Sequence, residues 1–194
     1  MKNVLITYIE KTGVSLEEIN DLLKKCASNK HSISLNILDY SLQDKSSEIK
    51  NLDWQLGMPV LTYKKYDYEE YDKLKIHLCD TIESSSPIPD CFIKIFSSVK
   101  VFPGFVDDME LDFLDDPNYG YVYGDFYIKQ EGFEEELGIP FLHSTPPLKS
   151  QTIPIIAFCC KKFVSNAGHE NTEGLILSNC AGKHIPKYLS TLLV

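Results

Sequence analysis

Residues 3–37 read NVLITYIEKTGVSLEEINDLLKKCASNKHSISLNI, and this stretch decides the fold class. Its first part, residues 3–9, is short, apolar and partly β-branched, which predicts a buried strand. The run Ser15–Glu18 forms a capping box, in which a hydroxyl and a carboxylate satisfy backbone N–H groups at a helix start. The apolar spacing that follows predicts a helix to about residue 27. Residues 33–37 alternate apolar and polar side chains, which predicts a half-buried strand and completes a strand–helix–strand unit compatible with parallel pairing.

The rest of the chain predicts further strands and helices, with no internal repeat. Apolar or tyrosine-rich runs predict strands over residues 58–63, 119–129, 153–160 and 175–177. Helical spacing predicts helices over residues 71–82, 92–99 (where a strand is the alternative) and 185–193, with Pro186 in a first turn. We therefore predict an α+β fold, a mixed sheet with helices packed on it, in a single domain over residues 1–194 with a candidate sub-boundary near residues 84–89.

The composition is that of a folded protein, with 43% hydrophobic and 24% charged residues. No stretch approaches the ~20 apolar residues of a membrane span. The N-terminal apolar run is too short for a signal peptide, and no small-residue cleavage site follows it. The sequence therefore predicts a cytoplasmic protein that does not engage a membrane and whose six cysteines are reduced.

The negative charge is concentrated in the middle of the chain. Residues 1–100 carry 15 acids and 13 lysines, residues 101–140 carry 11 acids and one lysine, and residues 141–194 carry two acids and five lysines. The chain contains no arginine, so it lacks the guanidinium fork that captures phosphate or carboxylate through two hydrogen bonds. Phosphate-handling functions are therefore less favoured, and direct binding of nucleic acid is disfavoured by repulsion.

The acidic segment 101–140 also holds nine of the 22 aromatic residues, unlike a disordered acidic tail. Its acids interleave with apolar residues, which predicts a folded element with one buried and one charged face. A charged surface with tyrosines attracts a basic protein and speeds its association. The predicted partner-binding residues are Asp107, Asp108, Glu110, Asp112, Asp115, Asp116, Tyr119 and Tyr121.

Metal and phosphate motifs fail on geometry. A calcium-binding EF-hand loop begun at Asp108 has Phe113 where the sharp turn needs glycine and Tyr119 where the ion needs glutamate. A phosphate-binding loop ending at Gly182-Lys183 has Leu177 and His184 in place of its first glycine and its magnesium-binding hydroxyl. We therefore predict no metal site and no cofactor.

Cys180 is the candidate nucleophile, because it follows the predicted strand 175–177 in a turn of small residues. The candidate bases are His143, His169 and His184. A small buried cysteine is the structural alternative.

Two functional interpretations follow from these patterns. The first is an acidic binding module, not an enzyme, that neutralises a basic partner in the manner of an immunity-type inhibitor of a toxin. The second is a thiol-dependent hydrolase or transferase that uses Cys180. No catalytic residue is assigned under the first interpretation.

Overall fold

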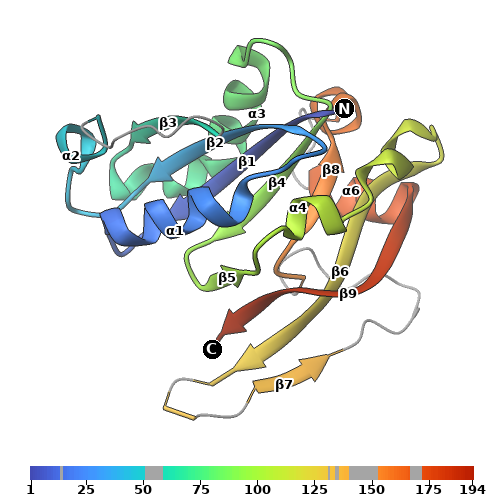
Figure 1. Ribbon diagram of the computed structural model, residues 1–194. Helices are drawn as coiled ribbons and strands as arrows, with labels where there is room; N and C mark the ends of the chain where they lie inside the picture. Colours follow the sequence, from blue (N-terminus) through green and yellow to red (C-terminus); the bar gives the residue numbers. More distant parts are fainter. Residues whose placement is uncertain (14, 51–58, 131, 134–135, 140–152, 167–171) are drawn as a thin grey trace.

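A computed structural model describes residues 1–13, 15–50, 59–130, 132–133, 136–139, 153–166 and 172–194. Within these residues, strands from both ends of the chain form one mixed sheet (Figure 1). The strands are β1 (Asn3–Glu10), β2 (Ser32–Asp39), β3 (Val60–Lys65), β4 (Cys91–Phe96), β5 (Val99–Val101), β6 (Tyr119–Lys129), β7 (Glu136–Ile139), β8 (Ile156–Cys159) and β9 (Ala181–Leu193).

Six α-helices and two 3₁₀ helices accompany the sheet in the described residues. They are α1 (Leu16–Cys26), α2 (Ser46–Lys50), η1 (Tyr68–Lys73), α3 (Leu74–Ser84), α4 (Phe105–Asp108), η2 (Leu111–Asp115), α5 (Cys160–Ser165) and α6 (Thr172–Asn179). The predicted fold class, α+β with helices packed on a mixed sheet, is therefore confirmed.

The strand order is β3-β2-β1-β4-β8-β6-β9-β5, with β7 paired to β6. The first four strands are parallel. β8 is antiparallel to β4 and β6, whereas β6 and β9 are parallel. In Figure 1, β6, β7 and the end of β9 extend beyond the parallel strands near the C-terminus.

Helices cover both faces of this sheet, so the chain folds in three layers. One core joins α1, through Ile19 and Leu23, and α4, through Phe105, to one face of the parallel strands. A second core packs α5 and α6 on the opposite face, through Phe163 and Ile176. Because β1 and β4 are buried on both faces, their sequences are nearly continuous apolar runs.

The opening strand–helix–strand unit agrees with its sequence-based prediction. β1 and β2 pair in parallel from Asn3↔Ser32 to Glu10↔Asp39. Ser15 caps α1 in a complete capping box with Glu18. The amphipathic spacing of α1 thus directs its apolar face onto the sheet.

Three local predictions are wrong or only partly right. Residues 92–99 are not a helix but lie in β4 and at the start of β5, which supports the strand alternative. Leu175–Leu177 lies in α6, a helix with no amphipathic pattern. Residues 185–193 belong to β9, where Pro186 lies beside an irregularity in the register with β6. A proline cannot donate to the ladder, so a strand tolerates it at such an irregularity.

The described part of the acidic segment is folded, as its aromatic content predicts. Phe105, Val106, Met109 and Leu111 are at most 1% exposed and pack in the same core as the buried face of α1. All six cysteines are free. Among the described residues, no helix combines the length and the apolarity needed to cross a bilayer.

Candidate functional site: a cleft at the switch point of the sheet

The order in which the parallel strands are added to the sheet reverses at β1. The chain passes from β1 to β2 and then β3 on one side, whereas β4 lies on the other side of β1. In open parallel sheets, ligands bind outside the carboxyl ends of the strands at this kind of switch point. The carboxyl ends of β1 and β4 are therefore the candidate ligand-binding edge of the sheet.

A cleft of about 810 Å³ opens at those ends, and we call it the switch-point cleft. Its volume lies in the range of roughly 300–1,000 Å³ that small-molecule sites occupy. It is bounded by the loop after β1, the turn between β4 and β5, and the ends of β6 and β9. Side chains and backbone that line it include Glu10, Thr12, Ser98, Lys100, Lys129 and Thr191.

The loop after β1 wraps around the carboxylate of Glu10. Glu10 Oε1 accepts hydrogen bonds from the backbone N–H groups of Lys11 (2.7 Å), Thr12 (2.5 Å) and Gly13 (3.1 Å). The Thr12 hydroxyl donates to the same oxygen at 2.7 Å. Gly13 has φ of 109°, a backbone conformation that glycine adopts without strain. Glu10 is only 2% exposed, so it fixes the shape of the loop rather than facing a ligand.

The second acid at the carboxyl ends, Asp39 of β2, is also fully engaged. Its carboxylate accepts a hydrogen bond from the Ser41 N–H at 2.7 Å and from the Tyr63 hydroxyl at 2.5 Å. Lys65 Nζ lies 3.7 Å from Asp39 Oδ1. Burial and the hydrogen bond to Asp39 raise the pKa of Tyr63, which therefore stays a hydroxyl donor. Asp39 is thus a structural anchor for the ends of β2 and β3.

The end of β4 carries hydroxyls instead of carboxylates. β4 ends at Phe96, and Ser97 and Ser98 follow it into the cleft. Magnesium and manganese prefer carboxylate and other oxygen ligands. Glu10 and Glu18, the acids that line the cleft in the described residues, both accept hydrogen bonds from backbone N–H groups. In the part of the chain that the structure describes, no cluster of three His, Cys, Asp or Glu side chains suits a metal ion.

Lysines supply the positive charge of the switch-point cleft. Lys25 comes from α1, Lys100 from β5 and Lys129 from the end of β6. Lys129 is the single lysine of the acidic segment 101–140. The described residues that line the cleft thus include three lysines and two acids, in a chain of net charge −9.

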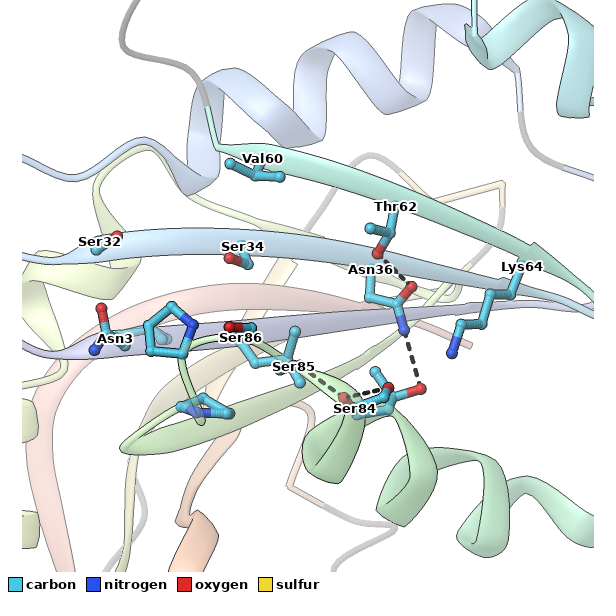
Figure 2. A pocket seen from close by; sticks show the side chains of 15 residues that line it. Asn3, Ser32, Ser34, Asn36, Val60, Thr62, Lys64, Ser84, Ser85 and Ser86 are labelled. Atoms are coloured by element: carbon cyan, nitrogen blue, oxygen red, sulfur yellow. Dashed lines mark hydrogen bonds between the residues drawn. The ribbon is translucent and has the colours of Figure 1, made fainter.

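A second cavity, of about 240 Å³, lies on the face of β1–β3 beside the end of α3 (Figure 2). We call it the hydroxyl-lined hollow. Asn36 lies between Thr62 and α3, accepting a hydrogen bond from the Thr62 hydroxyl at 2.7 Å and donating to Thr81 at 3.3 Å. The other polar side chains that line the hydroxyl-lined hollow include Ser32, Ser34, Lys64, Ser84, Ser85 and Ser86. It opens along the amino-terminal halves of β1 and β2, away from their carboxyl ends.

The predicted partner-binding acids lie on α4 and η2 or, for Glu110 and Asp116, directly beside η2, and all are outside the switch-point cleft. Several of them make contacts within the chain. Asp107 accepts hydrogen bonds from Ser28, Asp108 pairs with Lys187 at 2.6 Å and Asp115 pairs with Lys2 at 2.5 Å.

The two predicted partner-binding tyrosines differ in exposure. Tyr119 is half-buried, and its ring lies 5.8 Å from that of Phe113. Tyr121 is only 6% exposed. Partner binding by the acidic segment stays a prediction.

Cys180 follows helix α6, not a strand, so its predicted setting is wrong. Lys162 Nζ lies 3.7 Å from its sulfur, and the same ammonium donates to the carbonyls of Pro117 and Tyr119. Among the candidate bases, His184 pairs with Asp125 at 2.8 Å. His143 and His169 lie outside the described residues.

Comparisons with known proteins support the fold but not a family. No family model matches the chain, and no curated protein matches its sequence. Among solved structures, S. aureus TarS 1-349 has a TM-score of 0.62 at 11% identity, over 100% of this chain and 60% of that one. GalNAc-T7 with UDP, GalNAc and Mn²⁺ has a TM-score of 0.61 at 10% identity, over 98% of this chain and 44% of that one.

A third similar structure is the mannosyltransferase PcManGT from Pyrobaculum calidifontis, in complex with GDP-Man and Mn²⁺. Its TM-score is 0.58 at 8% identity, over 98% of this chain and 56% of that one. TarS 1-349 was also solved in complex with UDP-GlcNAc. This chain therefore spans 44–60% of the length of these three proteins.

The sequence-based functional interpretation is wrong. Over almost its whole length, the chain shares its fold with structures solved with UDP-GlcNAc and with GDP-Man. This finding contradicts its interpretation as an immunity-type inhibitor with a thiol-dependent enzyme as the alternative. The inhibitor interpretation was based on the acidic segment, whose negative charge is concentrated in 40 consecutive residues and is therefore visible in the sequence. Sequence analysis did not identify the residues of the switch-point cleft, because they are spread from Glu10 to Val194 and form no short motif.

Proposed function

We propose that this chain binds a nucleoside diphosphate sugar in the switch-point cleft and serves as a sugar-transferase domain. The observation that carries the proposal is the position of the cleft, at the carboxyl ends of β1 and β4 in this fold. Similar structures were solved with UDP-GlcNAc and with GDP-Man, so this ligand class is the one to test. The reaction would pass the sugar from the diphosphate to an acceptor hydroxyl.

The cleft has properties that suit such a ligand. Its volume of about 810 Å³ can hold a nucleotide with its sugar. Ser97 and Ser98 line it at the end of β4, and the exposed Ser98 hydroxyl can bond to ribose or sugar oxygens. Lysines attract the negative diphosphate, whereas the acidic surface of α4 and η2 would repel it. The charge distribution therefore favours this cleft over the acidic segment for a phosphate ligand.

The test is a binding measurement with matched blocking variants. UDP-GlcNAc and GDP-mannose are titrated calorimetrically into wild type, Ser98→Trp and Ser34→Trp. Both serines are exposed, the first in the switch-point cleft and the second in the hydroxyl-lined hollow. An indole in the cleft should exclude the ligand and lower affinity by at least about tenfold, or about 1.4 kcal/mol, whereas Ser34→Trp should bind like wild type.

Two results would contradict the proposal. Wild type that binds neither nucleotide sugar, nor UDP or GDP, would remove the ligand class. Binding that survives in Ser98→Trp and is lost in Ser34→Trp would move the ligand to the hydroxyl-lined hollow. Thermal unfolding of each variant without ligand is the control for folding.

A further inference from the structure

The switch-point cleft disagrees with two of the similar structures on one chemical point. GalNAc-T7 and PcManGT were solved with Mn²⁺. In this chain, Phe96, Ser97 and Ser98 occupy the end of β4, and none of them offers a carboxylate. The nearby Glu10 carboxylate accepts four hydrogen bonds within its own loop. Among the residues that the structure describes, the donor set around the cleft therefore does not fit a divalent cation.

A diphosphate still needs positive charge around it, because its oxygens carry at least two negative charges. Lysine ammonium groups supply that charge as point donors without the fixed fork of arginine, which this chain lacks. Lys25, Lys100 and Lys129 reach the cleft from three separate elements. We propose that these lysines hold the diphosphate of the ligand in place of a metal ion; the inference rests on the proposed function.

Lys100 is the best-placed of the three to meet a ligand. It is exposed, and its ammonium has no hydrogen-bond or ion-pair partner among the described residues. Its neighbours Val99 and Val101 are buried, and β5 pairs with β9, so its backbone is fixed. Lys25 is also paired with Asp21 at 2.6 Å on α1, in a partly exposed contact that a diphosphate can replace.

The two acids that line the described part of the cleft are engaged with backbone donors. Glu10 is buried under its own loop. Glu18 accepts the Ser15 N–H at 2.9 Å in the capping box of α1. Both carboxylates thus accept hydrogen bonds from backbone N–H groups of their own segments.

The experiment measures UDP binding with and without metal. Calorimetric titrations of the full chain are run in EDTA, in Mg²⁺ and in Mn²⁺, at constant ionic strength. The expected result is the same affinity in all three, within about twofold. Loss of at least tenfold in EDTA, recovered by Mn²⁺, would overturn the inference and leave the proposed function standing.

Single-residue variants test whether the cleft lysines supply the positive charge that binds the diphosphate. Lys100→Gln and Lys129→Gln should each weaken UDP binding by about tenfold, the cost of one charge-assisted hydrogen bond. Lys64→Gln, in the hydroxyl-lined hollow, is the matched control and should bind like wild type. Uridine, which has no phosphate, should bind wild type and all three variants with one affinity.

The remaining outcomes separate the two proposals. If UDP binds in EDTA and neither cleft variant weakens it, the lysine assignment is wrong although the cleft binds nucleotide. If wild type binds neither UDP nor GDP with or without metal, the proposed function fails first. Circular dichroism melts should show that each lysine variant remains folded.

Discussion

The switch-point cleft and the hydroxyl-lined hollow border the same parallel strands but differ in charge. Among the described residues, three lysines and two acids line the cleft, whereas the charged residue that lines the hollow is Lys64. At the carboxyl ends, the strands finish, and the N–H groups of the following loops are not used in the sheet. These N–H groups donate instead to buried acids such as Glu10. Along the amino-terminal halves the ladders are complete, and neutral side chains such as Asn36 satisfy one another. Ionised ligands therefore suit the cleft, and the hollow is suited to holding α3 on the sheet.

The largest effect on stability should come from Asp39 at the carboxyl end of β2. Replacing it with alanine breaks the pair with Lys65, which keeps backbone carbonyl acceptors, and leaves the Ser41 N–H and Tyr63 hydroxyl without an acceptor. Breaking a buried pair in this way costs about 3 kcal/mol. Urea denaturation should show this loss for Asp39→Ala and a smaller one for Asp39→Asn, which keeps an oxygen acceptor. Equal stability of wild type and Asp39→Ala would mean that the charged anchor is not needed.

The next effect should come from Asn36, the matching polar residue of the hydroxyl-lined hollow. Asn36→Ala removes two neutral hydrogen bonds, to Thr62 and Thr81, at a cost of about 1 kcal/mol. The loss is smaller than at Asp39 because no charge is left unpaired and Thr62 is exposed to water. The same urea series measures it. A loss as large as that of Asp39→Ala would remove the distinction between the two ends.

These comparisons also show what the sequence can and cannot predict. The capping box at Ser15 and the alternation in β2 act over a few residues, so the first strand–helix–strand unit follows directly from the sequence. β4 is buried on both faces, and such a short apolar run does not distinguish strand from helix. Pro186 suggests a helix start, yet it lies in β9 where the pairing is irregular. The cleft depends on residues brought together only by the finished sheet, such as Lys25 and Lys129.

The stability of the protein should depend on pH through His77 of α3, the helix beside the hollow. His77 is 8% exposed, and its ring lies 3.9 Å from that of Tyr66 and bonds to the Tyr40 hydroxyl at 2.7 Å. Burial lowers the pKa of His77 more than nearby acids raise it. Below about pH 6.5, the unfolded chain binds a proton at this histidine that the folded chain does not. Stability should therefore be full above that pH and fall as the pH decreases towards the lower pKa of the folded state.

The variant His77→Gln tests this assignment. Its free energy of unfolding should fall less than that of wild type between pH 7.5 and pH 5.5, whatever its stability at neutral pH. Chemical denaturation at each pH measures the difference. Parallel pH profiles of wild type and variant would assign the acid sensitivity to other groups.

The smallest effect should be at Asp108, on the acidic segment that dominates the sequence. Asp108 pairs with Lys187 at 2.6 Å, but their side chains are 45% and 51% exposed. Water and salt screen such a pair, so Asp108→Asn should leave the melting temperature unchanged within error.

Its neighbour Asp107 is the matched comparison, because it accepts hydrogen bonds from Ser28 and from the Asn29 N–H and so joins α4 to the loop after α1. Asp107→Asn should lower the melting temperature measurably. UDP binding should be unchanged in both variants, since neither side chain lines the switch-point cleft. A change in affinity at Asp108 would mean that the acidic segment, and not only the cleft lysines, determines where the ligand binds.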